Sequence, residues 1–114
     1  VLGSYDPDAK VLTIAQFNLP DSAADLPYVN SLWELQDKPF AGVAVNSYND
    51  GEAQPGAGQL GPFYEIETSS PAAELASGES ITHVHRTMHL AGDETALNGL
   101  AGAVLGVELG EIVD

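Results

Sequence analysis

Two segments decide the fold that this chain is expected to adopt: Phe63-Tyr64-Glu65-Ile66-Glu67-Thr68 and Ile81-Thr82-His83-Val84-His85-Arg86-Thr87-Met88-His89-Leu90. Their β-branched and aromatic residues are typical of strands. Because alternate side chains of a strand share a face, Glu65 and Glu67 point the same way, and so do His83 and His85. The sequence therefore places its candidate acidic and histidine site residues on two successive strands.

The rest of the chain adds further strands and one helix. Strands are expected over residues 11–17, 28–35, 40–48, 63–68 and 81–90. A helix is expected over residues 93–105, with Asp93 as its N-cap and Gly106 as its stop. Its apolar positions are spaced i, i+3, i+4, i+7 and i+8: Leu97, Leu100, Ala101, Val104 and Leu105.

These elements predict a mainly β fold, an antiparallel β-sandwich with one C-terminal α-helix. At 114 residues, the chain is expected to be a single domain (residues 1–114) or the C-terminal fragment of a larger one. A partial sandwich would leave a sheet edge or an apolar face exposed, so we also expect a homodimer that covers it.

The charge balance excludes two classes of partner. The formal net charge is −14, and the only cations among Lys and Arg are Lys10, Lys38 and Arg86. Nucleic acids and anionic membranes are bound through basic side chains, so neither is expected as a partner. The acidity itself is typical of a soluble, strongly solvated surface.

Glu65 and Glu67 are candidates for acid–base chemistry. Desolvation or a neighbouring like charge raises the pKa of a carboxyl group toward neutrality, where it can act as a general base. The alternative is that both side chains belong to a solvated face of an acidic protein.

The histidines suggest a second kind of site. On a strand, His83 and His85 lie on one face and can converge on a divalent metal. The alternative is that they are hydrogen-bonded or exposed. Met88 and Leu90 lie on the opposite, core-facing side together with Arg86, which needs an acidic partner such as Glu65 or Glu67 or reaches the surface at the sheet edge.

The window Gly78-x4-His83-x-His85-x3-His89-x2-Gly92 resembles the first motif of cupins, which are small metal-binding β-barrels. This resemblance implies an alternative function, a cupin-like protein that holds one divalent transition metal through His83 and His85.

A broader resemblance covers about residues 10–112. It is carried by the segments Tyr28–Glu34, Asn46–Gly51, Gly61–Ala72 and Thr82–Thr87, and by the turn Glu74-Leu75-x2-Gly78-Glu79-Ser80. They are similar to an uncharacterised bacterial family with a galactose mutarotase-like (aldose 1-epimerase-like) fold. The resemblance implies carbohydrate binding or processing without a cofactor, with Glu67 as the catalytic base and Glu65 as the fallback. The histidine acid of such enzymes has no counterpart by position here, so we expect an incomplete mutarotase site.

Aromatic and polar side chains suit a carbohydrate ligand. Trp33, Tyr48 and Tyr64 are candidates for stacking on sugar rings, and Asn49 and Arg86 for hydrogen bonding to hydroxyl groups. Phe40 is a further stacking candidate, and Asn46 and Asp50 are further hydroxyl partners. The alternatives are core packing for Trp33 and Phe40 and turn formation by Asn49-Asp50-Gly51.

Overall fold

The computed structural model describes residues 1–32, 34–52, 54–59 and 61–112. They form two compact units, residues 1–18 with 84–114 and residues 19–83, which are described separately below. The expectation of a mainly β fold with antiparallel sheets and a single α-helix near the C-terminus is confirmed. The sandwich type and the single domain stay predictions. Within the described residues, no helix is both long and apolar enough to span a membrane.

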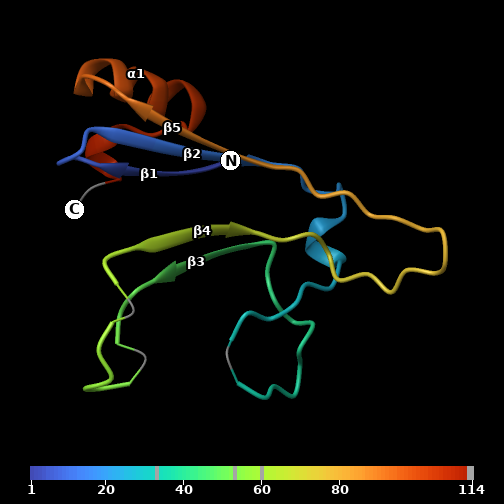
Figure 1. Cartoon of the computed structure of the whole chain (residues 1–114). Coiled ribbons are helices and arrows are strands. Elements are labelled where there is room, and N and C mark those ends of the chain that lie inside the picture. The colour runs from blue at the N-terminus through green and yellow to red at the C-terminus, as the bar shows by residue number, and fades with distance from the viewer. Residues whose placement is uncertain (33, 53, 60, 113–114) are drawn as a thin grey trace. The chain divides into compact units, whose positions relative to one another are not determined.

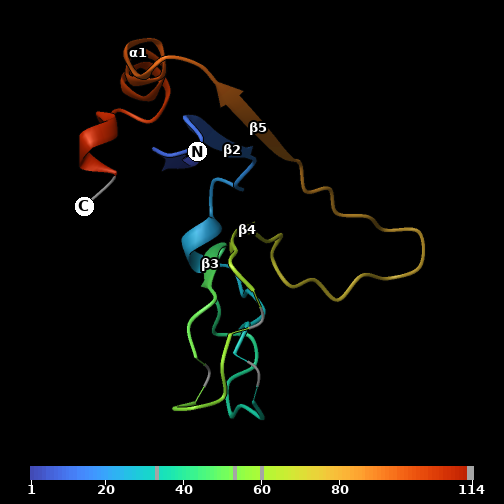
Figure 2. The same cartoon turned by 60° about the vertical axis from the view of Figure 1, so that its left-hand side comes forward.

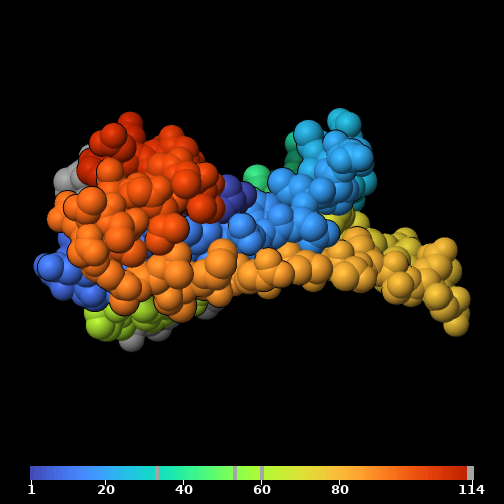
Figure 3. All heavy atoms as spheres, turned by 90° about the horizontal axis from the view of Figure 1, so that it is seen from above, coloured from blue at the N-terminus to red at the C-terminus, as the bar shows by residue number. Residues whose placement is uncertain are grey.

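The first unit is a three-stranded antiparallel sheet with a helix packed on it. Its strands are β1 (Leu2–Asp6), β2 (Val11–Phe17) and β5 (His85–Ala91), in the order β1-β2-β5. The helix α1 (Glu94–Val104) and the short 3₁₀ helix η2 (Leu109–Glu111) follow β5. Figures 1 and 2 show α1 next to the sheet, and in Figure 3 its orange and red atoms lie over those of β2.

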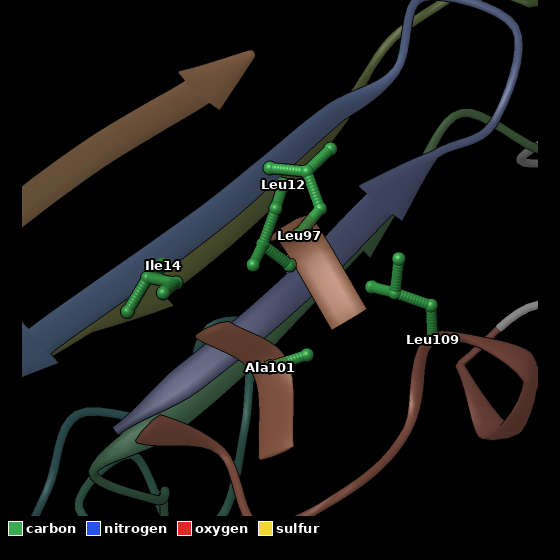
Figure 4. Close-up of a cluster of buried hydrophobic side chains, with 5 residues drawn as sticks. All are labelled: Leu12, Ile14, Leu97, Ala101 and Leu109. Carbon is green, nitrogen blue, oxygen red and sulfur yellow. The ribbon is translucent and has the colours of Figure 1, made fainter. Parts of the chain in front are cut away.

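The core of this unit lies between β2 and the two C-terminal helices (Figure 4). It is formed by Leu12, Ile14, Leu97, Ala101 and Leu109, which are all at most 2% exposed. Met88 and Leu90 of β5 pack against this cluster, as expected from the alternation along that strand. Burial of these apolar side chains is the main stabilising term of the unit.

Asp93 and Gly106 lie at the two ends of α1, as the sequence predicted, and the bounds of the helix differ from the predicted bounds by one residue at each end. The Asp93 side chain accepts a hydrogen bond of 3.0 Å from the Ala96 amide. At the other end, Gly106 adopts a positive φ of 78° and donates to the Ala101 carbonyl. Asn98 accepts a 2.7 Å hydrogen bond from the Leu109 amide, which ties η2 to the helix.

Strand β1 was not predicted. Gly3 and Ser4 are weak strand formers, so the segment carries little local signal. The turn that follows aligns it with β2, since the Asp6 carboxylate accepts hydrogen bonds from the Asp8 and Ala9 amides at 3.0 and 2.9 Å. Gly3 packs closely against Leu105, whose side chain would have to shift to make room for a Cβ atom there.

The predicted strand over residues 81–90 begins four residues later, at His85. Its partner β2 ends at Phe17, which pairs with His85, and Pro20 follows shortly after. Among the described residues, no strand pairs with residues 81–84, and beyond the end of β2 the Asn18 amide donates a backbone hydrogen bond to this segment, to the Val84 carbonyl.

The second unit is built around an antiparallel pair, β3 (Val45–Asn49) and β4 (Tyr64–Thr68), with the 3₁₀ helix η1 (Ala23–Asp25) before it. The prediction of a strand over 63–68 is confirmed within one residue. The prediction over 40–48 is correct only for its C-terminal half.

The predicted strand over 28–35 is wrong for the described part of that segment. Only Tyr28 forms a bridge, a parallel one to Ala41. Beyond it, side chains compete for the backbone: Asn30 Oδ1 accepts from the Leu32 amide at 3.2 Å, and Gln36 Nε2 donates to the Leu32 carbonyl at 2.8 Å. These local bonds favour a turn over a strand.

Candidate functional site

One face of the β3–β4 pair carries the candidate site. In the register, Asn46 is opposite Glu67 and Tyr48 is opposite Glu65, so these four side chains share a face. They line a cavity of about 130 Å³. Among the described residues, the lining consists of Ser31, Asn46, Ser47, Tyr48, Phe63, Glu65 and Glu67.

A chain of polar contacts holds one end of this cavity. The Asn46 side-chain amide donates to Glu67 Oε2 at 3.1 Å and to Ser31 Oγ at 2.8 Å. Asn46 therefore uses its amide hydrogens on two neighbours and orients the Glu67 carboxylate. This fixes a hydrogen-bond acceptor inside the cavity.

Glu65 and Glu67 form a carboxyl pair. The hydrogen bond to Glu67 raises the pKa of Glu65 above its usual value, and desolvation and the negative charge of Glu67 raise it further. A neighbouring negative charge disfavours ionisation of a carboxyl group. The cavity thus contains a proton acceptor next to a group that retains its proton to higher pH.

The aromatic side of the cavity is formed by Tyr48 and Phe63. Their rings stack with centroids 5.7 Å apart and an interplanar angle of 25°. The Tyr48 hydroxyl donates to Asp50 Oδ1 at 3.1 Å. Desolvation, followed by this hydrogen bond and the charges of Asp50 and Glu65, raises the pKa of Tyr48. The phenol therefore stays neutral and acts as a donor.

Asp50 stabilises the site through hydrogen bonds made by a buried residue. It is only 3% exposed, and its Oδ2 accepts a 2.6 Å hydrogen bond from the Gly61 amide. Its carbonyl accepts a 2.6 Å bond from the Gln59 side chain. These contacts tie both ends of the glycine-rich loop 51–61 together, next to Phe63, which directly precedes β4.

The predicted site residues are only partly brought together. Glu65, Glu67 and Tyr48 line the cavity, whereas Asn49 and Tyr64 pair with each other on the opposite face of the hairpin. Trp33 lies outside the described residues.

Arg86 is not near the core of its unit. It is exposed and donates to Gln16 Oε1 at 3.4 Å, which agrees with the expectation that it reaches the surface. Phe40 is 60% exposed, so the expectation that it packs in a core is wrong.

The histidines are distributed over both units. His83 Nε2 is 2.8 Å from Thr68 Oγ1 in the second unit, while in the first unit His85 Nε2 is 2.9 Å from Thr87 Oγ1. His89 Nδ1 is 2.9 Å from Thr13 Oγ1. In the part of the chain that the structure describes, no group of three or more His, Asp or Glu side chains could hold a metal ion.

Three lining residues were missed by the sequence analysis: Ser31, Ser47 and Phe63. Phe63 shares its alternation with Glu65 and Glu67, so strand periodicity alone could have placed it on their face. Ser31 gave no such signal, because it approaches Asn46 from a segment that was expected to be a strand.

A second cavity of the same unit has a different character. It measures about 680 Å³ and is lined by Pro27, Val29, Phe40, Ala72, Ala73 and Glu74. Its lining is mostly apolar, and it lacks the convergent polar groups of the smaller cavity.

Comparison with known proteins identifies the family. A family model described as a family of unknown function (DUF6786) matches residues 1–114, so the chain belongs to that family. No curated protein and no solved structure matches the chain.

Proposed function

We propose that the cavity on the β3–β4 face binds a monosaccharide and that its carboxyl pair can process the sugar. The observation that carries this proposal is the combination in one cavity of Glu65 and Glu67 with the Tyr48–Phe63 aromatic stack. Sugar sites commonly combine an apolar ring face with convergent hydrogen-bonding groups, because a sugar has both apolar and hydroxyl-bearing surfaces.

The carboxyl pair supports a mutarotase-like reaction. Interconversion of anomers requires a proton to leave the hydroxyl group on the anomeric carbon and a proton to reach the ring oxygen. Both oxygens are bonded to the same carbon, so two adjacent carboxyl groups can serve both steps. Glu67, oriented by Asn46, removes the hydroxyl proton while Glu65 donates its own proton to the ring oxygen, and the bond between the anomeric carbon and the ring oxygen breaks to give the open-chain aldehyde. After rotation of the aldehyde group the ring closes again, and both proton transfers run in reverse and restore the carboxyl pair.

This assignment deepens the resemblance to galactose mutarotase-like proteins. It retains Glu67 as the base and gives Glu65 the acid role that a histidine has in those enzymes. The proposed sandwich and homodimer belong to the same resemblance. Sedimentation at micromolar concentration tests the dimer, and a monomer there would contradict it.

The experiment separates binding from chemistry. Ligand-detected NMR with glucose and galactose measures binding, and exchange spectroscopy between the anomeric signals measures interconversion above the spontaneous rate. We expect Glu67→Gln to abolish the rate enhancement and Glu65→Gln to reduce it strongly. Glu94→Gln, which removes the same charge from a residue that does not line the cavity, is the control. Equal rates for all variants would reject the catalytic role.

The proposed chemistry uses no cofactor. The alternative is one divalent transition metal held by His83 and His85. Elemental analysis of untagged protein decides between them: about one metal per chain, lost in the His83→Ala/His85→Ala double variant, would favour the metal site. A metal-free protein would favour the carboxyl pair.

A further inference from the structure

We propose that the β3–β4 cavity selects a cationic sugar, a 2-amino-2-deoxyhexose with a free ammonium group, over neutral and anionic sugars. The inference rests on the proposed monosaccharide site and names the class of sugar that its lining recognises. It is based on the charges and the aromatic rings that the lining brings together.

The first argument is the arrangement of acceptors. Glu65 and Glu67 both line the cavity; Asn46 donates to Glu67 and the two carboxyl groups share a hydrogen bond, so the carboxyl oxygens not used in these bonds are acceptors toward a ligand. A neutral hydroxyl group supplies one donor hydrogen, whereas an ammonium group supplies three and carries a positive charge. Charge-assisted hydrogen bonds of this kind are about twice as strong as neutral ones.

A cation would also stabilise the ionised form of the carboxyl pair. Two carboxyl groups side by side repel each other when both are ionised, and this repulsion contributes to the raised pKa of Glu65. A ligand ammonium group placed between them would compensate both charges. The described lining contains no Lys, Arg or His that could do so from the protein.

The aromatic side gives an independent argument. Tyr48 and Phe63 present stacked rings to the same cavity. The faces of such rings carry partial negative charge and attract cations that lie within about 6 Å of the ring centre. Because Tyr48 is opposite Glu65 in the register, an ammonium group bound by that carboxyl group would lie beside this aromatic side.

The same features exclude anionic sugars. A sugar phosphate or a uronic acid would place a negative charge next to two carboxyl groups with no basic side chain in the described lining to pair with it. An unpaired charge brought into such a site loses its hydration without compensation. The cavity thus discriminates by repulsion as well as by attraction.

The test is a comparison of four ligands by NMR titration at about pH 6 and physiological ionic strength. Glucosamine is the cationic probe, N-acetylglucosamine the neutral analogue with the same substituted position, glucose the parent sugar, and glucose 6-phosphate the anionic probe. We expect glucosamine to bind about fivefold or more tightly than glucose, as one charge-assisted bond in place of a neutral one implies. We expect no binding of glucose 6-phosphate.

Variants separate a local effect from attraction by the net charge. Glu65→Gln and Glu67→Gln should each remove the preference for glucosamine, while Glu94→Gln should retain it. An equal loss in all three variants would assign the preference to overall charge and overturn the inference. Equal or tighter binding of glucose would overturn it while leaving the monosaccharide site intact, and no binding of any sugar would reject the site itself.

Discussion

The two units of this protein are held together by different forces. In the first unit, the buried cluster is apolar and lies between β2 and the helices α1 and η2. In the second unit, the described buried residues are Tyr28 and Asp50, and several large apolar side chains are exposed, including Val29 and Phe40 at 59% and 60%. The first unit is thus stabilised by packing, while the second depends on individual hydrogen bonds around its cavity.

The two units therefore have different roles: the first is a packed scaffold, and the second contains the candidate site. A packed apolar core tolerates little change, whereas a surface organised by hydrogen bonds can present polar groups to a ligand. The carboxyl pair, the aromatic stack and both cavities belong to the second unit. The contrast predicts how variants in each unit should behave.

The largest loss of stability is expected from Leu97→Ala in the core of the first unit. Leu97 is 2% exposed, and such a truncation in a packed core costs about 2–5 kcal/mol. Amide hydrogen exchange of β2 and β5 measures the loss. Leu100→Ala, at a position that is 40% exposed, is the control, and a comparable loss there would contradict the proposed packing. Exchange of the β3 and β4 amides in the same samples shows whether the units unfold together.

Asp50→Ala is expected to destabilise the second unit by a smaller amount, and the loss should be confined to the hydrogen bonds around Asp50. It leaves the Gly61 amide and the Tyr48 hydroxyl without their acceptor, at a cost of about 1–3 kcal/mol. Faster exchange of the Gly61 amide is the readout. Asp50→Asn keeps one acceptor oxygen and should lose less stability. Asp37→Ala, at an exposed position, should lose no stability. Unchanged Gly61 exchange in Asp50→Ala would refute the role of Asp50.

Removal of the helix N-cap should lower the stability of the first unit by less than the two preceding variants lower that of their units. Asp93→Ala deletes the acceptor for the Ala96 amide and is expected to cost about 0.5–2 kcal/mol. Urea unfolding followed by the helical circular dichroism signal measures it. Asp93→Asn retains the cap and should restore most of the stability; an equally unstable Asn variant would argue against the cap.

The smallest expected effect concerns the pH dependence of the second unit. Because the pKa of Glu65 is raised above its usual 4.5, the fold favours the protonated form. Its contribution to stability is present below that value and is lost as the pH rises through the raised pKa. Glu67→Gln should move the pKa of Glu65 back toward its usual value, as measured by carbon-13 NMR of the side-chain carboxyl. An unchanged titration would show that the pair does not interact.

The sequence predicted some parts of this structure much better than others. Strand β2 and helix α1 were located almost to the residue, because a β-branched run and a capped, periodic helix are local signals. Residues 28–35 were misjudged because their apolar content resembles a strand while Asn30 and Gln36 redirect the backbone. Strand β1 was missed because pairing with β2 compensates for its weak local preference.

For the site, strand alternation alone placed Glu65 and Glu67 on a common face, and their acidic character suggested acid–base chemistry. Only the tertiary structure decided that Asn46, Tyr48 and Ser31 join them, and that Asn49 and Tyr64 lie on the other face of the hairpin. The reason is physical: alternation is a property of one strand, whereas a cavity depends on the register between strands and on the loops that meet there.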